Sequence, residues 1–323
     1  MRVATTLARR RLDPRERARI AASRTHGEEV SRLPLALSSD TSPSSHQALV
    51  AAYAPDDGLM VDGALPLLWW TLAPNFGDLL SPWLAGRMTG RPVVYAPPRT
   101  PHVVAVGSIV SNARRDSIVW GSGLMGFETK WRIPRAGRYA AVRGPLTRSI
   151  LRNIDYDVPR IYGDPALLAP LYFNPEVEKT HDVGLVVRWS ERLWHDVSVG
   201  DDVKVINLAT SDVEGVIRDL MACRAIASSS LHGLILADAY GLPNAWLDSD
   251  SAGGGSRPGG GEFKFYDYFA SVDKLRHSQA LDLASERLTA DRLHDRLDFS
   301  GDDIQFDHGR LLDACPFLRR SAD

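Results

Sequence analysis

The chain alternates short apolar runs with segments of helical or turn character from about residue 65 onward. The first group of runs covers residues 67–72, 92–95, 103–106, 117–120, 140–142 and 160–162, and the second covers residues 183–187, 203–208, 225–227 and 244–247. Apolar strands that alternate with helices are typical of a parallel sheet with helices on both faces. The pattern restarts after residues 170–180, which hold two prolines and several charges. We therefore predict an α/β protein of two Rossmann-like domains, residues 61–175 and 176–323, the second ending in a C-terminal tail.

Residues 1–60 differ in composition from the rest of the chain. They are rich in arginine at first and then in Ser, Thr and Pro over residues 38–45. Such a composition buries too little apolar surface to join a core. We expect residues 1–60 to form a poorly ordered extension.

A buried strand leads directly into an apolar helix near the middle of the second domain. The strand is expected over residues 223–227 and the helix over residues 233–240, with Ser230 and His232 at the junction. Ligands of parallel sheets bind at the carboxyl ends of strands, so both side chains are expected to face a cleft. The structural alternative is that His232 only satisfies a buried backbone group.

Other polar residues lie at the ends of predicted strands. Arg188 ends one strand, where a guanidinium suits phosphate or carboxylate recognition, although an ordinary surface arginine is the alternative. Asn75 and Asp78 precede a helix expected over residues 79–88, so they cap it and also reach the cleft. Asp164 precedes a proline and is either a turn former or a cleft carboxylate.

Composition and charge narrow the classes of function. The formal net charge is −2, and the arginines of residues 9–24 alternate with acidic residues without aromatics, so we expect no nucleic-acid partner. Cys223 and Cys315 form neither a disulfide framework nor a metal cluster, and we expect no metal. No apolar run approaches the roughly 20 residues of a membrane span, and no secretory signal is evident. We expect a soluble cytoplasmic protein with at most a peripheral membrane contact.

Residues 121–126 read GSGLMG and match the dinucleotide fingerprint G-x-G-x-x-G letter for letter. The fingerprint needs a helix at its third glycine and an acidic residue about 20 positions later. Pro134 interrupts any such helix, and no acidic residue lies at that distance. We therefore reject a dinucleotide site and retain only the hypothesis that Gly121 and Ser122 line the cleft and meet an anion.

Five motifs in order resemble those of the polysaccharide pyruvyl transferase family. They are residues 75–78 (NFGD), 142–145 (VRGP), 162–166 (YGDPA), 229–243 (SSLHGLILADAYGLP) and 263–268 (FKFYDY). The resemblance covers roughly residues 65–270. It implies two parallel-sheet domains facing a cleft, as in GT-B glycosyltransferases. It also implies transfer of pyruvate from phosphoenolpyruvate to two hydroxyls of a sugar in a surface polysaccharide or its precursor, with release of phosphate.

The implied reaction assigns catalytic roles. Protonation of the donor's methylene carbon needs a general acid, for which His232 is the first choice. A base must take the proton of the attacking hydroxyl, and Asp78 and Asp164 are the alternatives. The scheme requires no metal and no cofactor, because the donor is already activated and cations can neutralise the leaving phosphate.

The same resemblance assigns substrate-binding roles. Arg188 comes first for the phosphate and carboxylate of the donor, and Lys264 and Arg143 follow. The family often has arginine two residues before the histidine, where this chain has Ser230, so Lys264 or Arg143 would supply the missing charge. Asn75 and Gly77 belong to the loop expected to bind the acceptor sugar, for which a lipid-linked form is one alternative.

Two other functions remain open at the level of sequence. A GT-B nucleotide-sugar glycosyltransferase would use the same two-domain cleft, and a catalytically inactive sugar-binding relative would explain the departure at Ser230. The glycine-rich residues 252–261 are expected to form either a lid over the substrate or a simple linker.

Overall fold

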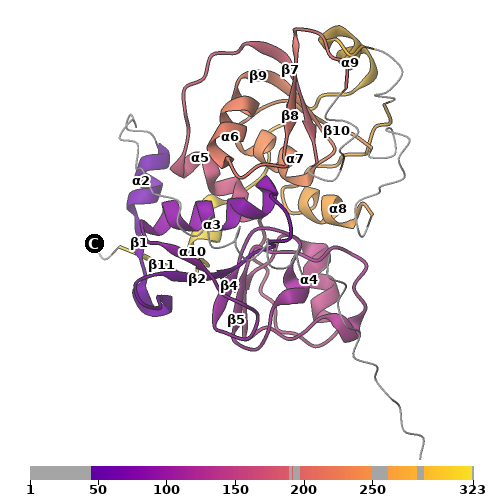
Figure 1. Ribbon diagram of the computed structural model, residues 1–323. Helices are drawn as coiled ribbons and strands as arrows, with labels where there is room; N and C mark the ends of the chain where they lie inside the picture. The colour runs from indigo at the N-terminus through magenta and orange to yellow at the C-terminus, as the bar shows by residue number, and fades with distance from the viewer. Residues whose placement is uncertain (1–44, 189–190, 192–196, 249–260, 282–286, 322–323) are drawn as a thin grey trace, which may run out of the picture.

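Two parallel β-sheets organise the part of the chain that the computed structural model describes, residues 45–188, 191, 197–248, 261–281 and 287–321 (Figure 1). The first sheet has the order β3-β2-β4-β5-β6 and consists of β2 (Leu65–Leu68), β3 (Val93–Tyr95), β4 (His102–Val104), β5 (Ser117–Trp120) and β6 (Arg138–Ala141). The second has the order β10-β9-β7-β8 and consists of β7 (His181–Val187), β8 (Val203–Asn207), β9 (Cys223–Ser228) and β10 (Asn244–Trp246). All pairings within both sheets are parallel. The prediction of an α/β protein with two parallel sheets is confirmed.

Both sheets share one doubly wound strand order. In each, the first strand pairs on one side with the second strand and on the other side with the third: β2 with β3 and β4, and β7 with β8 and β9. From that first strand the chain adds strands first on one side and then on the other. Ligands of such sheets bind beyond the carboxyl ends of the two strands at this point, which are β2 and β4 in the first sheet and β7 and β9 in the second.

Helices cover both faces of each sheet. They are α3 (Phe76–Thr89), α4 (Pro145–Arg152), α5 (Ala169–Tyr172), α6 (Val213–Met221), α7 (Leu231–Ala239), α8 (Phe263–Phe269) and α9 (Ala290–Arg296). Figure 1 shows α3 between the first sheet and α6, and one buried cluster takes side chains from β2, α3, α6, α7 and β9. Because α7 is buried on almost every side, it is apolar all round rather than amphipathic.

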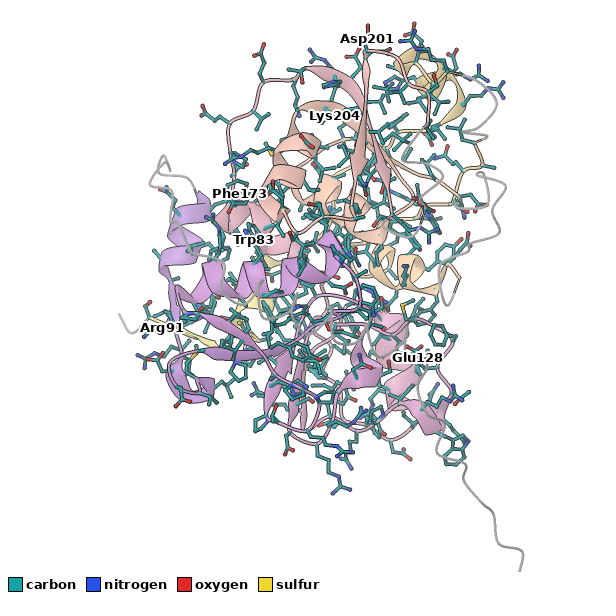
Figure 2. All side chains as sticks on the ribbon, in the orientation of Figure 1. Trp83, Arg91, Glu128, Phe173, Asp201 and Lys204 are labelled. Atoms are coloured by element: carbon teal, nitrogen blue, oxygen red, sulfur yellow. The ribbon has the colours of Figure 1, made fainter. Side chains whose placement is uncertain are left out.

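Side chains and backbone tie the two halves together. The amide of Phe76, at the start of α3, donates to the carbonyl of Leu208 after β8. Trp83 of α3 meets the ring of Phe173 edge-on, with the ring centroids 6.1 Å apart. Figure 2 labels both residues. This shared core fixes the carboxyl edge of one sheet relative to the other.

Part of the predicted N-terminal extension is ordered, which corrects the expectation for residues 45–60. α2 (Ser45–Ala51), β1 (Tyr53–Pro55) and η1 (Asp57–Leu59) lie there, and β1 pairs antiparallel with β11 (Leu318–Arg320). The side chains of Leu49 and Tyr53 pack on the core, and the Tyr53 hydroxyl also donates to Asp313, the last residue of α10 (His308–Asp313). The C-terminal end therefore returns to the first half of the molecule. Residues 1–44 lie outside the described residues.

Several predicted boundaries shift. Residues 160–162 do not form a strand, because only Tyr162 bridges to Val142. The first core strand ends at Leu68 rather than at residue 72. The helix expected from residue 233 starts at Leu231 because Ser230 adopts the extended backbone of an N-cap residue. Of the glycine-rich residues expected to form a lid or linker, 252–260 lie outside the described residues.

Candidate functional site

His232 lies in the first turn of α7, between the two sheets. Its ring packs against Gly77 of α3, where a built Cβ would be 2.2 Å from Nδ1, and its Nε2 is 3.8 Å from Oδ2 of Asp164. The side chain is 14% exposed, and Nε2 has no hydrogen-bond partner among the described residues. Burial, aided by the positive charges of Lys264 and Arg143, lowers the pKa of His232 to about 3. The imidazole is therefore neutral at pH 7.

The first turn of α3 supplies a carboxyl group, Asp78, one residue after the glycine that the His232 ring contacts. Asn75 caps α3 by accepting from the amide of Gly77 at 3.4 Å, and its Nδ2 donates to Oδ2 of Asp78 at 2.5 Å. Burial raises the pKa of Asp78 to about 7, although the hydrogen bond from Asn75 and the charge of Lys264 oppose the rise. The other oxygen of Asp78 lies close to Gly107 after β4. The titration of Asp78 therefore moves toward neutral pH.

A second carboxyl group comes from Asp164, which is completely buried. It caps η4 (Pro165–Leu168) by accepting from the amide of Ala166 at 3.0 Å, and its Oδ2 has no hydrogen-bond partner among the described residues. Burial raises the pKa of Asp164 to about 6, opposed by the Ala166 amide and the charge of Arg143. Buried polar atoms without partners are rare, and here Oδ2 of Asp164 and Nε2 of His232 face one another.

Arg188 follows β7 and is held by the carboxylate of Glu191, which was not among the predicted site residues. Its Nε and Nη2 donate to Oε1 of Glu191, and its backbone amide donates to Oε2 at 3.1 Å. Ser229, after β9, also donates to Oε2 of Glu191. The guanidinium is thus fixed at the carboxyl end of the second sheet. It lies close enough to Lys264 for its charge to lower the pKa of that amine.

Lys264 lies at the start of α8, with Nζ 5.3 Å from the ring centroid of Phe265. No ion pair within 4.0 Å joins it to a carboxylate in the described ranges. Burial lowers the pKa of Lys264 to about 7, helped by the positive charges of Arg188 and Arg143 and opposed by Asp78. A buried amine surrounded by cations gains its proton readily when an anion arrives.

Arg143 is completely buried in an ion pair with Asp267 of α8, which corrects the expectation that it binds the donor directly. Its Nε donates to Asp267 at 3.1 Å, its Nη1 to Ser108 Oγ at 2.6 Å and its Nη2 to the Leu124 carbonyl at 2.7 Å. Thr147 of α4 donates to Asp267 through its amide and its hydroxyl. Arg143 and Asp267 therefore connect the start of α4 to α8. The charge of Arg143 lowers the pKa of His232 and of Lys264.

The GSGLMG segment has a packing function rather than the expected anion-binding one. No helix begins at its third glycine, which supports the rejection of a dinucleotide site. The amide of Gly121 donates to Ala141, and the hydroxyl of Ser122 is buried and donates to Gly107. A Cβ on Gly123 would be 2.4 Å from the guanidinium carbon of Arg143. The glycine there makes room for the buried arginine.

The structure thus brings a subset of the predicted residues together. The predicted residues that lie around the carboxyl edges of the two sheets are Asn75, Gly77, Asp78, Asp164, Arg188, Ser230, His232 and Lys264. Ser230 is the N-cap residue of α7. The arrangement combines a neutral imidazole, two carboxyl groups with raised pKa values and a cationic edge. Within the described ranges, no group of three or more His, Cys, Asp or Glu could hold a metal ion.

Replacing Gly77 with alanine is expected to abolish turnover without unfolding α3. The new methyl group would occupy the position of the His232 ring, while alanine favours the helix. The assay compares turnover per folded molecule with helicity by circular dichroism. Gly301→Ala is the matched control, because a Cβ there would meet only Pro243 at 3.6 Å. Full activity of Gly77→Ala would show that the ring need not lie against α3.

Comparison with known proteins supports one family. Residues 91–251, about half of the chain, match the family model described as polysaccharide pyruvyl transferase. An uncharacterized protein of Acanthamoeba polyphaga mimivirus is 29% identical over 207 residues, which cover 61% of this chain and 70% of that protein. No solved structure gives a significant match. In the part of the chain that the structure describes, no helix is long and apolar enough to span a membrane.

Proposed function

The chain belongs to the polysaccharide pyruvyl transferase family, and from this premise we propose that it transfers pyruvate from phosphoenolpyruvate to two hydroxyls of one sugar. The product is a cyclic pyruvate ketal, and phosphate is released. The acceptor is a surface polysaccharide or its precursor, and the expected compartment is the cytoplasm. Two doubly wound sheets with their ligand-binding edges brought together support a GT-B-like layout for this reaction.

One observation carries the proposal: His232 and Asp164 come from separate elements and face one another where both sheets end. The unpartnered Nε2 of His232 and Oδ2 of Asp164 lie 3.8 Å apart, so polar atoms of a substrate can satisfy both. Asp78 lies one residue after the glycine that receives the His232 ring. This is a set of proton donors and acceptors with separated pKa values, as acid–base chemistry requires.

The donor-binding side of the site is cationic. Phosphoenolpyruvate carries a phosphate and a carboxylate, and Lys264 and Arg188 lie on the side of α8 and β7. The amides of the first turn of α7 add the positive end of a helix dipole. We assign Lys264 to direct contact with the donor and Arg188 to the donor's carboxylate or phosphate. Arg143 contributes positive charge to the site without contacting the donor.

The chemistry needs two hydroxyl attacks and one proton to carbon. Protonation of the methylene carbon turns it into a methyl group and makes the neighbouring carbon electrophilic, and the first sugar oxygen bonds to that carbon as its own proton leaves. The second sugar oxygen then bonds to the same carbon while the bond to phosphate breaks. One hydroxyl proton replaces the proton given to carbon, and the other leaves with phosphate.

The low pKa of His232 modifies the expected acid role. In the free protein the imidazole is neutral, because it is buried beside Lys264 and Arg143. A bound anionic donor offsets those positive charges and raises the pKa of His232, so the ring becomes an acid only after the donor binds. Asp164, next to Nε2, then stabilises the imidazolium. In this proposal Asp78 exchanges the hydroxyl proton.

The proposal is tested by phosphate release from phosphoenolpyruvate with a panel of sugar acceptors. We expect phosphate release that depends on the acceptor and a ketal in the product by carbon NMR from labelled donor. Transfer of a glycosyl group from a nucleotide sugar by the same preparation, without ketal formation, would assign the protein to glycosyl transfer instead.

Donor affinity is expected to fall as the pH rises above about 7, because Lys264, with its pKa lowered to about 7, loses its charge there. The apparent KM for phosphoenolpyruvate should rise by up to about tenfold per pH unit in that range. Lys264→Arg keeps the charge at all these pH values, so its KM should stay nearly constant. Since the titration of the donor itself is common to both proteins, parallel KM profiles would contradict the assignment of Lys264.

A further inference from the structure

Two large aromatic side chains project from the segment that joins β5 to β6. Trp131 is 85% exposed and Phe127 is 63% exposed. The ammonium of Lys130 lies 4.5 Å from the Trp131 ring centroid, so an aromatic ring and a cation form one unit. Exposed apolar surface with a polar rim is typical of sites that contact a protein or a membrane.

Exposed basic residues are frequent in this segment and in the segment beside it. The amide of Gly137 donates to the carbonyl of Arg114, which places the residues before β5 beside the end of this segment. The exposed basic residues of the two segments are Arg114, Arg115, Lys130, Arg132, Arg135 and Arg138. We call them, together with Phe127 and Trp131, the basic-aromatic surface.

Acidic side chains are fewer on this surface. Glu128 is held by the amides of Met125 and Gly126, Asp116 is exposed, and Asp157 pairs with Arg152. The net charge of the basic-aromatic surface and its neighbours is therefore positive, although the chain as a whole has a formal net charge of −2. Positive charge is concentrated where the aromatic rings project.

The segment begins next to the candidate site. Gly126 packs so closely on Phe263 that a Cβ there would be 2.4 Å from the Cβ of Phe263, and Lys264 is the next residue of α8. Figure 2 labels Glu128 on the side of the molecule where Figure 1 places α4 and α8, and these two helices contact one another. The basic-aromatic surface therefore borders the α8 side of the site.

We propose that the basic-aromatic surface docks the protein on an anionic lipid bilayer. Trp and Phe rings insert at the level of the headgroups, and Lys and Arg are attracted to anionic headgroups. Either signal alone gives marginal binding, whereas an apolar insertion combined with a basic patch gives stable peripheral binding. This docking holds the α8 side of the site near the membrane and does not depend on the proposed reaction.

A groove in the same surface fits a headgroup. It has a volume of about 480 Å³, and its lining includes Arg135, Arg138, Tyr139 and one carboxylate, Asp157. Two guanidinium groups at one groove suit a phosphate diester, which Arg binds through paired hydrogen bonds. A protein partner is less favoured because, apart from the two rings, the exposed residues of this segment are basic, polar or glycine rather than apolar.

The test is co-sedimentation of the full chain with vesicles of phosphatidylglycerol and phosphatidylcholine, compared with vesicles of phosphatidylcholine alone. We expect at least about tenfold tighter binding to the anionic vesicles, lost in about 0.5 M salt because charges are then screened. The double variant Phe127→Ala, Trp131→Ala should lose about tenfold in affinity for the anionic vesicles. Leu275→Ala and Arg224→Ala are matched controls, because Leu275 is 83% exposed and Arg224 is an exposed arginine elsewhere.

Equal binding to neutral and anionic vesicles, no binding to either, or unchanged binding by the double variant would each overturn the proposal. Binding of a soluble anionic polysaccharide that the double variant loses, with no vesicle binding by the wild type, would assign the surface to a polymer. Circular dichroism of the variants confirms that a loss of binding is not a loss of fold.

Discussion

His232→Ala is expected to reduce turnover by about 10²-fold or more while the free energy of unfolding changes little. The activity loss follows because the ring lies between Gly77 and Asp164, where both sheets end. Stability should be nearly kept because buried Nε2 has no hydrogen-bond partner among the described residues, so its removal leaves no protein group unpaired. Turnover per folded molecule and urea unfolding of the same preparation measure both effects.

A second buried histidine provides the control. His102, on β4, interacts through one ring nitrogen with the hydroxyl of Ser117 at 2.8 Å and through the other with the Thr100 carbonyl at 2.6 Å. His102→Ala should lower the unfolding free energy and leave turnover per folded molecule near the wild-type value. A destabilised but active His232→Ala would reverse the two assignments and make His232 a structural residue.

Asp267→Ala is expected to have the largest effect on stability, a loss of about 3–5 kcal/mol in the free energy of unfolding. Asp267 and Arg143 are both completely buried, and the variant leaves the guanidinium charged without its carboxylate. It also removes the acceptor for the amide and hydroxyl of Thr147. Urea unfolding monitored by tryptophan fluorescence measures the change.

Two further variants test whether the loss of stability comes from the broken ion pair or from any substitution of a charged residue. Arg143→Met in the Asp267→Ala background removes the unpaired charge and should recover part of the lost stability. Asp182→Ala breaks an exposed ion pair with Arg224 and should change stability little. If Asp267→Ala were no more destabilising than Asp182→Ala, the buried pair would not hold α8 in place.

The sequence predicted the local features of the site well because they depend on short-range patterns. The periodicity predicts a strand, then Ser230 and His232, then an apolar helix, and the place of Asn75 before a helix predicts its capping role. Asp164, predicted as a turn former or a cleft carboxylate, caps η4. The same patterns gave two parallel sheets of alternating strands and helices. These patterns predict where each strand ends and each helix begins, and the side chains of the site lie at those ends.

The contacts that sequence reasoning missed join residues far apart in the chain. Arg143 was expected to bind the donor, but Asp267, 124 positions later, takes its guanidinium. β1 and β11 pair although they lie near opposite ends of the described chain. Neither short segment has a sequence pattern that predicts this pairing. For Glu191 a signal existed, since it follows Arg188 by three residues, yet its interaction with Ser229 depends on strand order. Long-range pairing is set by the packed fold, which local propensity does not encode.

The most direct measurement of the central claim is thermal unfolding with phosphoenolpyruvate and, separately, with a nucleotide diphosphate. A ligand that binds only the native state stabilises it by about 2.7 kcal/mol at a hundredfold excess over Kd, which shifts the melting temperature visibly. We expect phosphoenolpyruvate to raise the melting temperature of the wild type, to raise that of Lys264→Ala much less, and a nucleotide diphosphate to have no effect. Stabilisation by the nucleotide diphosphate, with none from phosphoenolpyruvate in the presence or absence of sugar acceptors, would contradict pyruvyl transfer at this site.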